Sequence, residues 1–464
     1  MFYCRNEELH KLNKRYDNGN FECVVIYGRR RVGKTTIINE FCKGKPTIFF
    51  SGLLEGTAKD NLKTLSRAIY EYKEQDSVDA PEYASFDSAL DEITRLADKE
   101  RIIFVIDEYP YLAKAYPSIS PRLQHLIDHK WKDGKLFLIL CGSSMSFMEN
   151  QVLGYQSPLY GRRTGQFKIE PLTYKETAVF NSNLDYITNA YVYGVTGGIP
   201  HYINKLNVQG DFRNALLENF FDRTSYLFEE PTNLLKQELR EPAVYNSVIT
   251  AIAEGASHMN EICTKSGIES GPCSKYLSVL INLGILKKET PITEKPGKKT
   301  IYSIADPFFR FWYRFVPNNL TPIASGRMEK LYDKAVQANL NDYMGLIFEK
   351  MCKDYLLYYA EEQDFQLVDI GQWWGTDSAD KKQVQIDLVG TTNNKNEYLI
   401  GSCKFRNEAV GIDELELLKK YASAFGKGKK YHYYIFSKGG FTEGLRAEAK
   451  NGEVRLVSLE DMYV

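Results

Sequence analysis

The residues with the clearest chemistry lie near the start of the chain, in the run Gly28-Arg29-Arg30-Arg31-Val32-Gly33-Lys34-Thr35-Thr36. Their spacing is G-x-x-x-x-G-K-[ST], the pattern of a loop whose backbone N–H groups cradle phosphates. Its glycines allow a tight turn and a close approach to the ligand. We expect Lys34 to reach the β- and γ-phosphates and Thr35 to offer its hydroxyl to Mg²⁺. The run therefore predicts a nucleoside triphosphate site.

A pair of acids complements this loop. Apolar residues at 102–106 lead directly into Asp107 and Glu108. This order places the acids at the carboxyl end of a buried strand, beside the phosphate loop. We expect Asp107 to hold the Mg²⁺ shell and Glu108 to orient or activate water. Many strands end in acids, but in combination with the loop this pair predicts ATP-type hydrolysis chemistry.

Three further polar residues could act at the same edge. The apolar run 136–140 leads towards Ser143, whose hydroxyl either senses the γ-phosphate or caps a turn. Arg162 and Arg163 follow on a glycine-flanked loop. An arginine there either stabilises the charge that develops in phosphoryl transfer, in cis or from a neighbour in a homo-oligomer, or is an ordinary surface residue. His125 and His129 fit an ordinary helix face better than a metal site.

The elements that position these residues follow from periodicity. Apolar strands at 23–27, 47–51, 102–107 and 135–141 alternate with helical sequence, which predicts an α/β fold with a parallel sheet in a P-loop core at 1–150. The segment 151–226 reads as helical, and we expect a helical lid at 151–235. Three short helices (245–253, 259–266, 271–283) and two strands (285–288, 300–304) then outline a winged helix at 236–316.

The winged helix carries lysines that could contact DNA phosphates: Lys275, Lys295, Lys298 and Lys299. Few of its residues could read bases, so any DNA binding would be non-sequence-specific, and a rigid coupler is the alternative. The aromatic run 308–315 predicts a buried docking segment, and the polar stretch 317–326 predicts a linker.

Four segments together resemble a known family: the arginine-rich phosphate loop, the start Phe2-Tyr3-Cys4-Arg5-Asn6-Glu7-Glu8-Leu9, the loop Tyr160-Gly161-Arg162-Arg163 and the break Gly197-Gly198-Ile199-Pro200. They are similar to archaeal-type ATPases of the AAA+/STAND-related P-loop superfamily. The resemblance implies ATP rather than GTP, with the Arg5 region closing over the adenine side. It also implies a winged helix followed by a C-terminal restriction-endonuclease-like domain.

Residues 317–464 are the segment that this resemblance assigns to the nuclease-like domain, with strands expected near 365–370, 384–389, 398–404 and 432–437. Nucleases of this type use an acid on a first helix, an Asp on a strand and E-x-K on the next strand to hold Mg²⁺. Here Glu349, Asp387 and Lys404 match, but Ser402 replaces the expected Glu. A displaced acid, Glu397 or Glu416, could substitute for it. The sequence is therefore compatible both with a domain that cleaves nucleic acid and with a degenerate domain that only binds.

Composition narrows the setting of the protein. The chain has 464 residues, enough for two to four domains, and a formal net charge of −1, which gives no global attraction to nucleic acid or anionic membranes. No apolar run approaches 18 residues, and the start lacks an apolar leader. The eight cysteines contain no C-x-x-C pair. We expect a cytoplasmic protein with reduced thiols and no membrane partner.

Two functions remain after these steps. In the first, ATP binding and hydrolysis drive a DNA-binding winged helix and a nuclease-like domain. In the second, the protein is a nucleotide-dependent switch or scaffold whose degenerate C-terminal domain recruits a protein partner.

Overall fold

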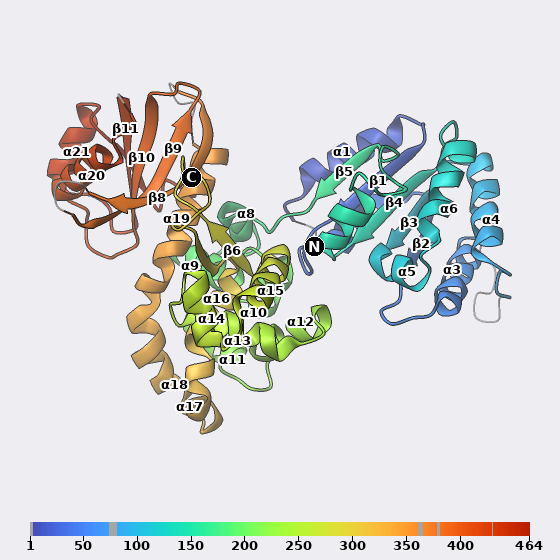
Figure 1. Cartoon of the computed structure of the whole chain (residues 1–464), viewed down its shortest axis with the longest axis horizontal. Coiled ribbons are helices and arrows are strands. Elements are labelled where there is room, and N and C mark those ends of the chain that lie inside the picture. The colour runs from blue at the N-terminus through green and yellow to red at the C-terminus, as the bar shows by residue number, and fades with distance from the viewer. Residues whose placement is uncertain (1–2, 74–80, 361–364, 378–380, 429) are drawn as a thin grey trace. The chain divides into compact units, whose positions relative to one another are not determined.

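The structure is a computed structural model that describes residues 3–73, 81–360, 365–377, 381–428 and 430–464. The chain divides into two compact units, Met1–Pro171 and Leu172–Val464. In the described part of the first unit, strands β1 to β5 form one sheet in the order β2-β3-β4-β1-β5, and every neighbouring pair runs parallel (Figure 1). The strands are β1 (Glu22–Tyr27), β2 (Thr47–Ser51), β3 (Ile103–Asp107), β4 (Phe137–Gly142) and β5 (Gly165–Lys168).

Helices flank this sheet (Figure 1). They are α1 (Asn6–Asp17), α2 (Lys34–Cys42), α3 (Ala58–Tyr72), α4 (Phe86–Lys99), α5 (Tyr109–Ala115), α6 (Ile119–Leu126), η1 (Ile127–Trp131), α7 (Met145–Phe147) and η2 (Met148–Val152). Every residue of β1, β3 and β4 is buried, as expected of central parallel strands covered on both faces. The predicted P-loop sheet is confirmed.

Strand β5 corrects one prediction. Its residues fall within 151–226, which we expected to be helical, but they pair with β1 from Val24 to Tyr27. The strand is short and alternates between half-buried and exposed residues, so it lacks the continuous apolar run that marks the other strands. Because β5 completes the sheet, the first unit extends to Pro171, and the expected boundary at 150 falls inside it.

The second unit begins with helices and a hairpin. The helices are α8 (Tyr174–Val179), α9 (Tyr186–Thr196), α10 (Pro200–Leu206), α11 (Phe212–Phe220), α12 (Tyr226–Glu238), α13 (Pro242–Ala253), α14 (Met259–Ser266) and α15 (Ser270–Asn282). Strands β6 (Leu286–Glu289) and β7 (Ile301–Ile304) then pair antiparallel. The three helices and two strands predicted for 245–304 are therefore present.

The aromatic run forms helix α16 (Pro307–Phe315) and is buried, as expected. Phe308 stacks on Tyr202 with ring centroids 4.3 Å apart, and Phe311 contacts Tyr343 edge-on at 5.5 Å. The linker predicted at 317–326 is wrong, because this stretch forms η3 (Pro317–Asn319) and α17 (Leu320–Ala324), with Ile323 buried. Further helices follow: α18 (Met328–Leu331), η4 (Tyr332–Val336), η5 (Gln337–Asn339) and α19 (Leu340–Tyr358).

A mixed sheet completes the second unit. Its order is β12-β11-β10-β9-β8. The pairs β8–β9 and β9–β10 run antiparallel, whereas the pairs β10–β11 and β11–β12 run parallel. Helix α20 packs on the sheet through Leu415, Leu418 and Ala422, with α21 beside it (Figure 1). The elements are β8 (Leu367–Thr376), β9 (Gln383–Thr392), β10 (Glu397–Lys404), α20 (Ile412–Phe425), β11 (Lys430–Ser437), α21 (Glu443–Lys450) and β12 (Arg455–Ser458).

The α/β fold class expected from the sequence is confirmed by these two sheets. Among the described residues, no helix combines the length and the apolar character that crossing a membrane requires.

Candidate functional site

The loop between β1 and α2 has the backbone of a phosphate cradle. Gly33 lies at φ 94°, in the left-handed region, and begins α2. Gly28 lies at φ 154°, and a Cβ there would come within 2.3 Å of the Ile169 carbonyl oxygen. Both positions therefore require glycine, and the turn that they form directs the loop N–H groups and the start of α2 towards one point.

Lys34 is buried at the start of α2. Its Nζ donates to the carbonyl oxygens of Gly28 at 2.8 Å and Arg29 at 2.9 Å. Burial lowers the pKa of Lys34, and the nearby Cys141, Glu108 and Asp107 oppose that shift. The ammonium group thus sits inside the loop, where phosphate oxygens would be better partners than neutral carbonyls.

Thr35 and Asp107 meet across the site. Thr35 Oγ1 donates to Asp107 Oδ2 at 3.0 Å, and Asp107 Oδ1 accepts from the Glu108 backbone N–H at 3.0 Å. A hydroxyl and a carboxylate side by side are the oxygen donors that Mg²⁺ accepts together with substrate phosphates. The residues present therefore fit a Mg²⁺ ion bound with a nucleotide.

Glu108 and Ser143 form a second pair at the ends of β3 and β4. Ser143 Oγ donates to Glu108 at 3.1 Å to Oε1 and 3.0 Å to Oε2. The Glu108 backbone lies at φ 46°, ψ 46°, a left-handed conformation that is costly for a residue with a side chain. This strained turn and the Ser143 hydroxyl together fix the Glu108 carboxylate next to Asp107. The residue that precedes helix α7 is Ser144 and not Ser143.

The two arginines are held elsewhere in the first unit. Arg162 forms two 2.8 Å hydrogen bonds with the Asp128 carboxylate, and Arg163 donates to the Leu153 carbonyl oxygen at 3.2 Å. Within the part of the chain that the structure describes, no hydrogen bond or ion pair joins either arginine to Asp107. Arg5, expected near the adenine side, donates to the Glu170 carbonyl oxygen at 2.6 Å, which anchors the start of the chain beyond β5.

A separate polar cluster lies in the C-terminal sheet. Lys404 Nζ lies 3.1 Å from Glu414 Oε1 and 3.9 Å from Asp387 Oδ2. Ser402 Oγ donates to Glu414 at 2.7 Å, and the Cys403 N–H donates to Asp387 at 2.9 Å. Glu414, from the first turn of α20, thus places an acid beside Ser402, the position where the nuclease pattern expects a Glu.

Neither acid suggested by the sequence occupies that place. Glu397 pairs with Lys430 and His432, each at 2.7 Å, and Glu416 is exposed. Glu414 was overlooked because it lies on a helix ten residues after Lys404. An acid in the first turn of the helix that follows the lysine strand is the signal that could have found it.

Asp387 lies in an irregular part of β9. The register shifts between the pairs Gly371↔Val389 and Trp373↔Ile386, so β9 has one extra residue relative to β8 at this point, which is a β-bulge. Such a bulge re-aims a side chain and is common beside functional sites. Burial raises the pKa of Asp387, and Lys404 opposes this shift.

Glu349 completes the cluster from α19. It accepts a hydrogen bond from Gln372 Nε2, and burial together with Asp387 raises its pKa to about 8. Asp387 thus acts electrostatically on Glu349 and lies 3.9 Å from Lys404, while a role for these three residues in a nuclease site stays a prediction. Within the described residues, however, no set of three acid, His or Cys side chains forms a ready metal cage. The ammonium of Lys404 lies between two of the acids instead.

The lysines predicted to contact DNA face solvent, one on α15 and three in the loop of the β6–β7 hairpin. Lys275, Lys295, Lys298 and Lys299 are exposed, and Lys299 pairs with Glu294 at 2.9 Å. In the same hairpin loop, the Ile292 N–H donates to the Gln372 carbonyl oxygen at 2.8 Å, and the Ile292 side chain packs on the C-terminal core. The hairpin is thus attached to β8.

Comparisons with known proteins support an ATPase domain in the N-terminal part of the chain. Residues 2–206 match a family described as an ATPase domain predominantly from Archaea, and residues 312–416 match archaeal and bacterial proteins of unknown function. An uncharacterised protein of Methanocaldococcus jannaschii is 34% identical over 466 residues, 99% of this chain and 100% of that protein. An uncharacterised ATP-binding protein of the same organism is 42% identical over 45 residues, 10% of this chain and 76% of that protein.

A solved structure has the same fold. The Walker-type ATPase of Pyrococcus abyssi aligns with a TM-score of 0.53 and 22% identity, over 68% of this chain and 96% of that one. The phosphate loop lies within residues 2–206, the part of the chain that matches the archaeal ATPase domain. The chain belongs to the family of archaeal P-loop ATPases.

Proposed function

We propose that this protein hydrolyses ATP at the phosphate loop and couples its nucleotide state, through a winged helix formed by α13–α15 and β6–β7, to a nuclease-like DNA-binding domain. The observation that carries the ATPase is the paired geometry at the sheet edge. Thr35 meets Asp107 at 3.0 Å, and Ser143 holds Glu108 beside them. One pair suits a metal ion and the other suits a water molecule.

The chain's own residues divide the work of hydrolysis. Lys34 exchanges the carbonyl oxygens of Gly28 and Arg29 for phosphate oxygens, so binding replaces neutral acceptors with charged ones. Thr35 and Asp107 would hold Mg²⁺, which would neutralise phosphate charge. Glu108 accepts a proton from the attacking water, and its strained backbone together with Ser143 sets its direction. Arg162 or Arg163 of a neighbouring copy is the source of a stabilising arginine.

Coupling within the second unit runs through the hairpin. Ile292 binds the backbone of Gln372, and the Gln372 side chain binds Glu349 in the acidic cluster. A displacement of the hairpin, whose exposed lysines contact DNA phosphates without base reading, therefore moves a residue that touches the cluster.

A second candidate function has its own support. Lys404 already pairs with Glu414 at 3.1 Å and lies 3.9 Å from Asp387, which offsets part of the acidic charge and favours a domain that binds a partner without cutting nucleic acid. In that case the protein is an ATP-dependent switch or scaffold, and its partner is a protein.

The deciding experiment measures ATP turnover of the full-length protein with and without DNA, alongside molar mass with and without ATP. Lys34→Ala should lower turnover by about a hundredfold or more, and Lys43→Ala, an exposed lysine paired with Glu40, is its control. Unchanged turnover in Lys34→Ala would contradict the ATPase. Turnover that DNA does not affect would favour the scaffold. Mg²⁺-dependent cleavage that Asp387→Ala abolishes would instead establish a nuclease.

A further inference from the structure

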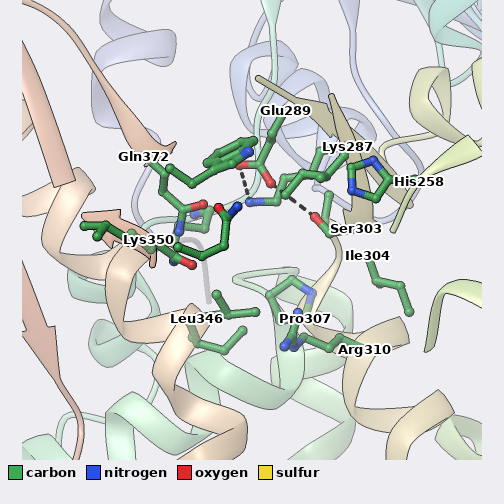
Figure 2. Close-up of a pocket in the computed structure, with 17 residues that line it drawn as sticks. His258, Lys287, Glu289, Ser303, Ile304, Pro307, Arg310, Leu346, Lys350 and Gln372 are labelled. Carbon is green, nitrogen blue, oxygen red and sulfur yellow. Dashed lines mark hydrogen bonds and ion pairs between the residues drawn. The ribbon is translucent and has the colours of Figure 1, made fainter. Parts of the chain in front are cut away.

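A cavity of about 510 Å³ lies in the second unit. The hairpin strands β6 and β7, helices α16 and α19, and strands β8 and β9 all contribute to its walls (Figure 2). Its volume falls within the range of small-molecule sites, about 300–1,000 Å³. The cavity is separate from the phosphate loop, which lies in the first unit, and its lining includes Gln372, the residue that binds Glu349.

Arg310 is the unusual member of this lining. Its Nε is sealed from solvent and has no hydrogen-bond partner among the residues that the structure describes. The other cations of the wall are paired, since Lys287 lies 2.7 Å from Glu289 and Lys350 lies 3.1 Å from Asp354. Burial lowers the pKa of Arg310, but a guanidinium stays charged in proteins. Glu349 and Asp342 attract this charge electrostatically. A buried Nε–H group without an acceptor is still costly, so this position indicates an anionic ligand.

The rest of the lining includes polar and aromatic side chains. Gln372 lies across the cavity from Arg310 in Figure 2. Trp374 on β8 and Gln383 and Gln385 on β9 also line the space, with Trp374 directly opposite Gln385 in the strand register. Amide groups can donate to and accept from base edges, and an indole offers a stacking face. The lining thus combines a guanidinium with an indole and several amide groups, which match the phosphate and the base of one nucleotide.

We propose that this cavity binds a single nucleotide unit, with its phosphate on Arg310 and its base against Trp374 and the glutamines. The unit is either a free nucleoside monophosphate or the 5′-phosphorylated end of a single DNA strand. For the strand source, the inference rests on the DNA-binding part of the proposed function. Binding of a free nucleotide stands independently of it.

The test uses the full-length protein in Mg²⁺-free buffer without ATP. Four probes are titrated: dTMP, thymidine, and pentathymidylate with a 5′-phosphate or a 5′-hydroxyl. We expect the phosphate to strengthen binding by about tenfold to a hundredfold in at least one pair, as a charge-assisted contact does. If the phosphorylated probe binds more tightly in both pairs, a free nucleotide is a sufficient ligand. If it binds more tightly only among the oligonucleotides, the ligand is the 5′-phosphorylated end of a strand.

Two variants locate the effect. Arg310→Gln should remove the phosphate preference, whereas Arg314→Gln, on the same helix but paired with Asp342 at 2.6 Å, should keep it. Bound thymine should quench tryptophan fluorescence, and Trp374→Phe should lose that quenching even if Arg310→Gln fails to fold. The preference should persist in Lys34→Ala, which separates this site from the phosphate loop. Equal binding with and without phosphate, or a preference that Arg310→Gln retains, overturns the proposal.

Discussion

Thr35 Oγ1 donates a 3.0 Å hydrogen bond to Asp107 Oδ2, joining the first turn of α2 to the end of β3. The two residues are 72 positions apart, and the parallel sheet brings them together because β1 and β3 both end at the same edge. The bond holds two oxygen atoms at one point, where the proposed Mg²⁺ ion would bind. The phosphate loop and the acidic strand therefore form a single site.

This relationship predicts non-additive mutants. Thr35→Ala and Asp107→Asn should each weaken Mg²⁺-dependent ATP turnover by about a hundredfold. Because both residues act through the same ion, the double variant should be little worse than the more damaging single one. Steady-state ATP turnover of the native protein, the two single variants and the double variant at several Mg²⁺ concentrations measures this double-mutant cycle. Strictly multiplicative losses would show that the residues act independently.

Glu108 should separate binding from hydrolysis. Glu108→Gln keeps the shape and the Ser143 contact but cannot take a proton, so turnover should fall by about a hundredfold or more while ATP affinity changes less than threefold. Ser143→Ala should cause a smaller loss, because the strained backbone still directs the carboxylate. Equilibrium ATP binding measured beside turnover checks both. A parallel loss of affinity in Glu108→Gln would assign this residue to binding instead.

Local sequence patterns were sufficient to place the residues of the candidate site at one edge of the sheet in the first unit. The loop glycines are fixed by backbone conformation, and Asp107 follows from a continuous apolar strand, so both signals lie within a few residues. Glu414 and the β9 bulge at Asp387 were not predictable in this way. Their positions depend on how α20 packs on β10 and how β8 registers with β9, which are tertiary relationships that no short window contains.

The hairpin lysines should govern DNA binding. Lys298→Glu with Lys299→Glu should weaken binding to duplex DNA of any sequence and reduce the slope of log affinity against log salt by about one per lost phosphate contact. Both side chains are exposed, so the unfolding midpoint should hardly change. Lys59→Glu with Lys63→Glu, two exposed lysines on α3, is the matched control. An identical salt slope in the hairpin variant would exclude these lysines from the DNA interface.

Glu349 should make the stability of the protein depend on pH. Burial and the neighbouring Asp387 raise its pKa from 4.5 to about 8 in the folded protein, so the folded state holds this proton more tightly than the unfolded chain does. The stabilising contribution is complete below pH 4.5 and is lost progressively as the pH rises through about 8. Gln at this position is neutral at every pH and can still accept the Gln372 hydrogen bond.

Glu349→Gln should therefore match the native protein at pH 5 and become the more stable of the two at pH 8.5. Urea unfolding midpoints at pH 5, 7 and 8.5 measure this difference, with Glu416→Gln, an exposed position on α20, as the control that should show no such trend. If Glu349→Gln and the native protein change in parallel across this range, then the Glu349 carboxylate is ionised in the fold. The cluster would in that case carry a full additional negative charge, and cation binding there would be favoured over the internal neutralisation by Lys404.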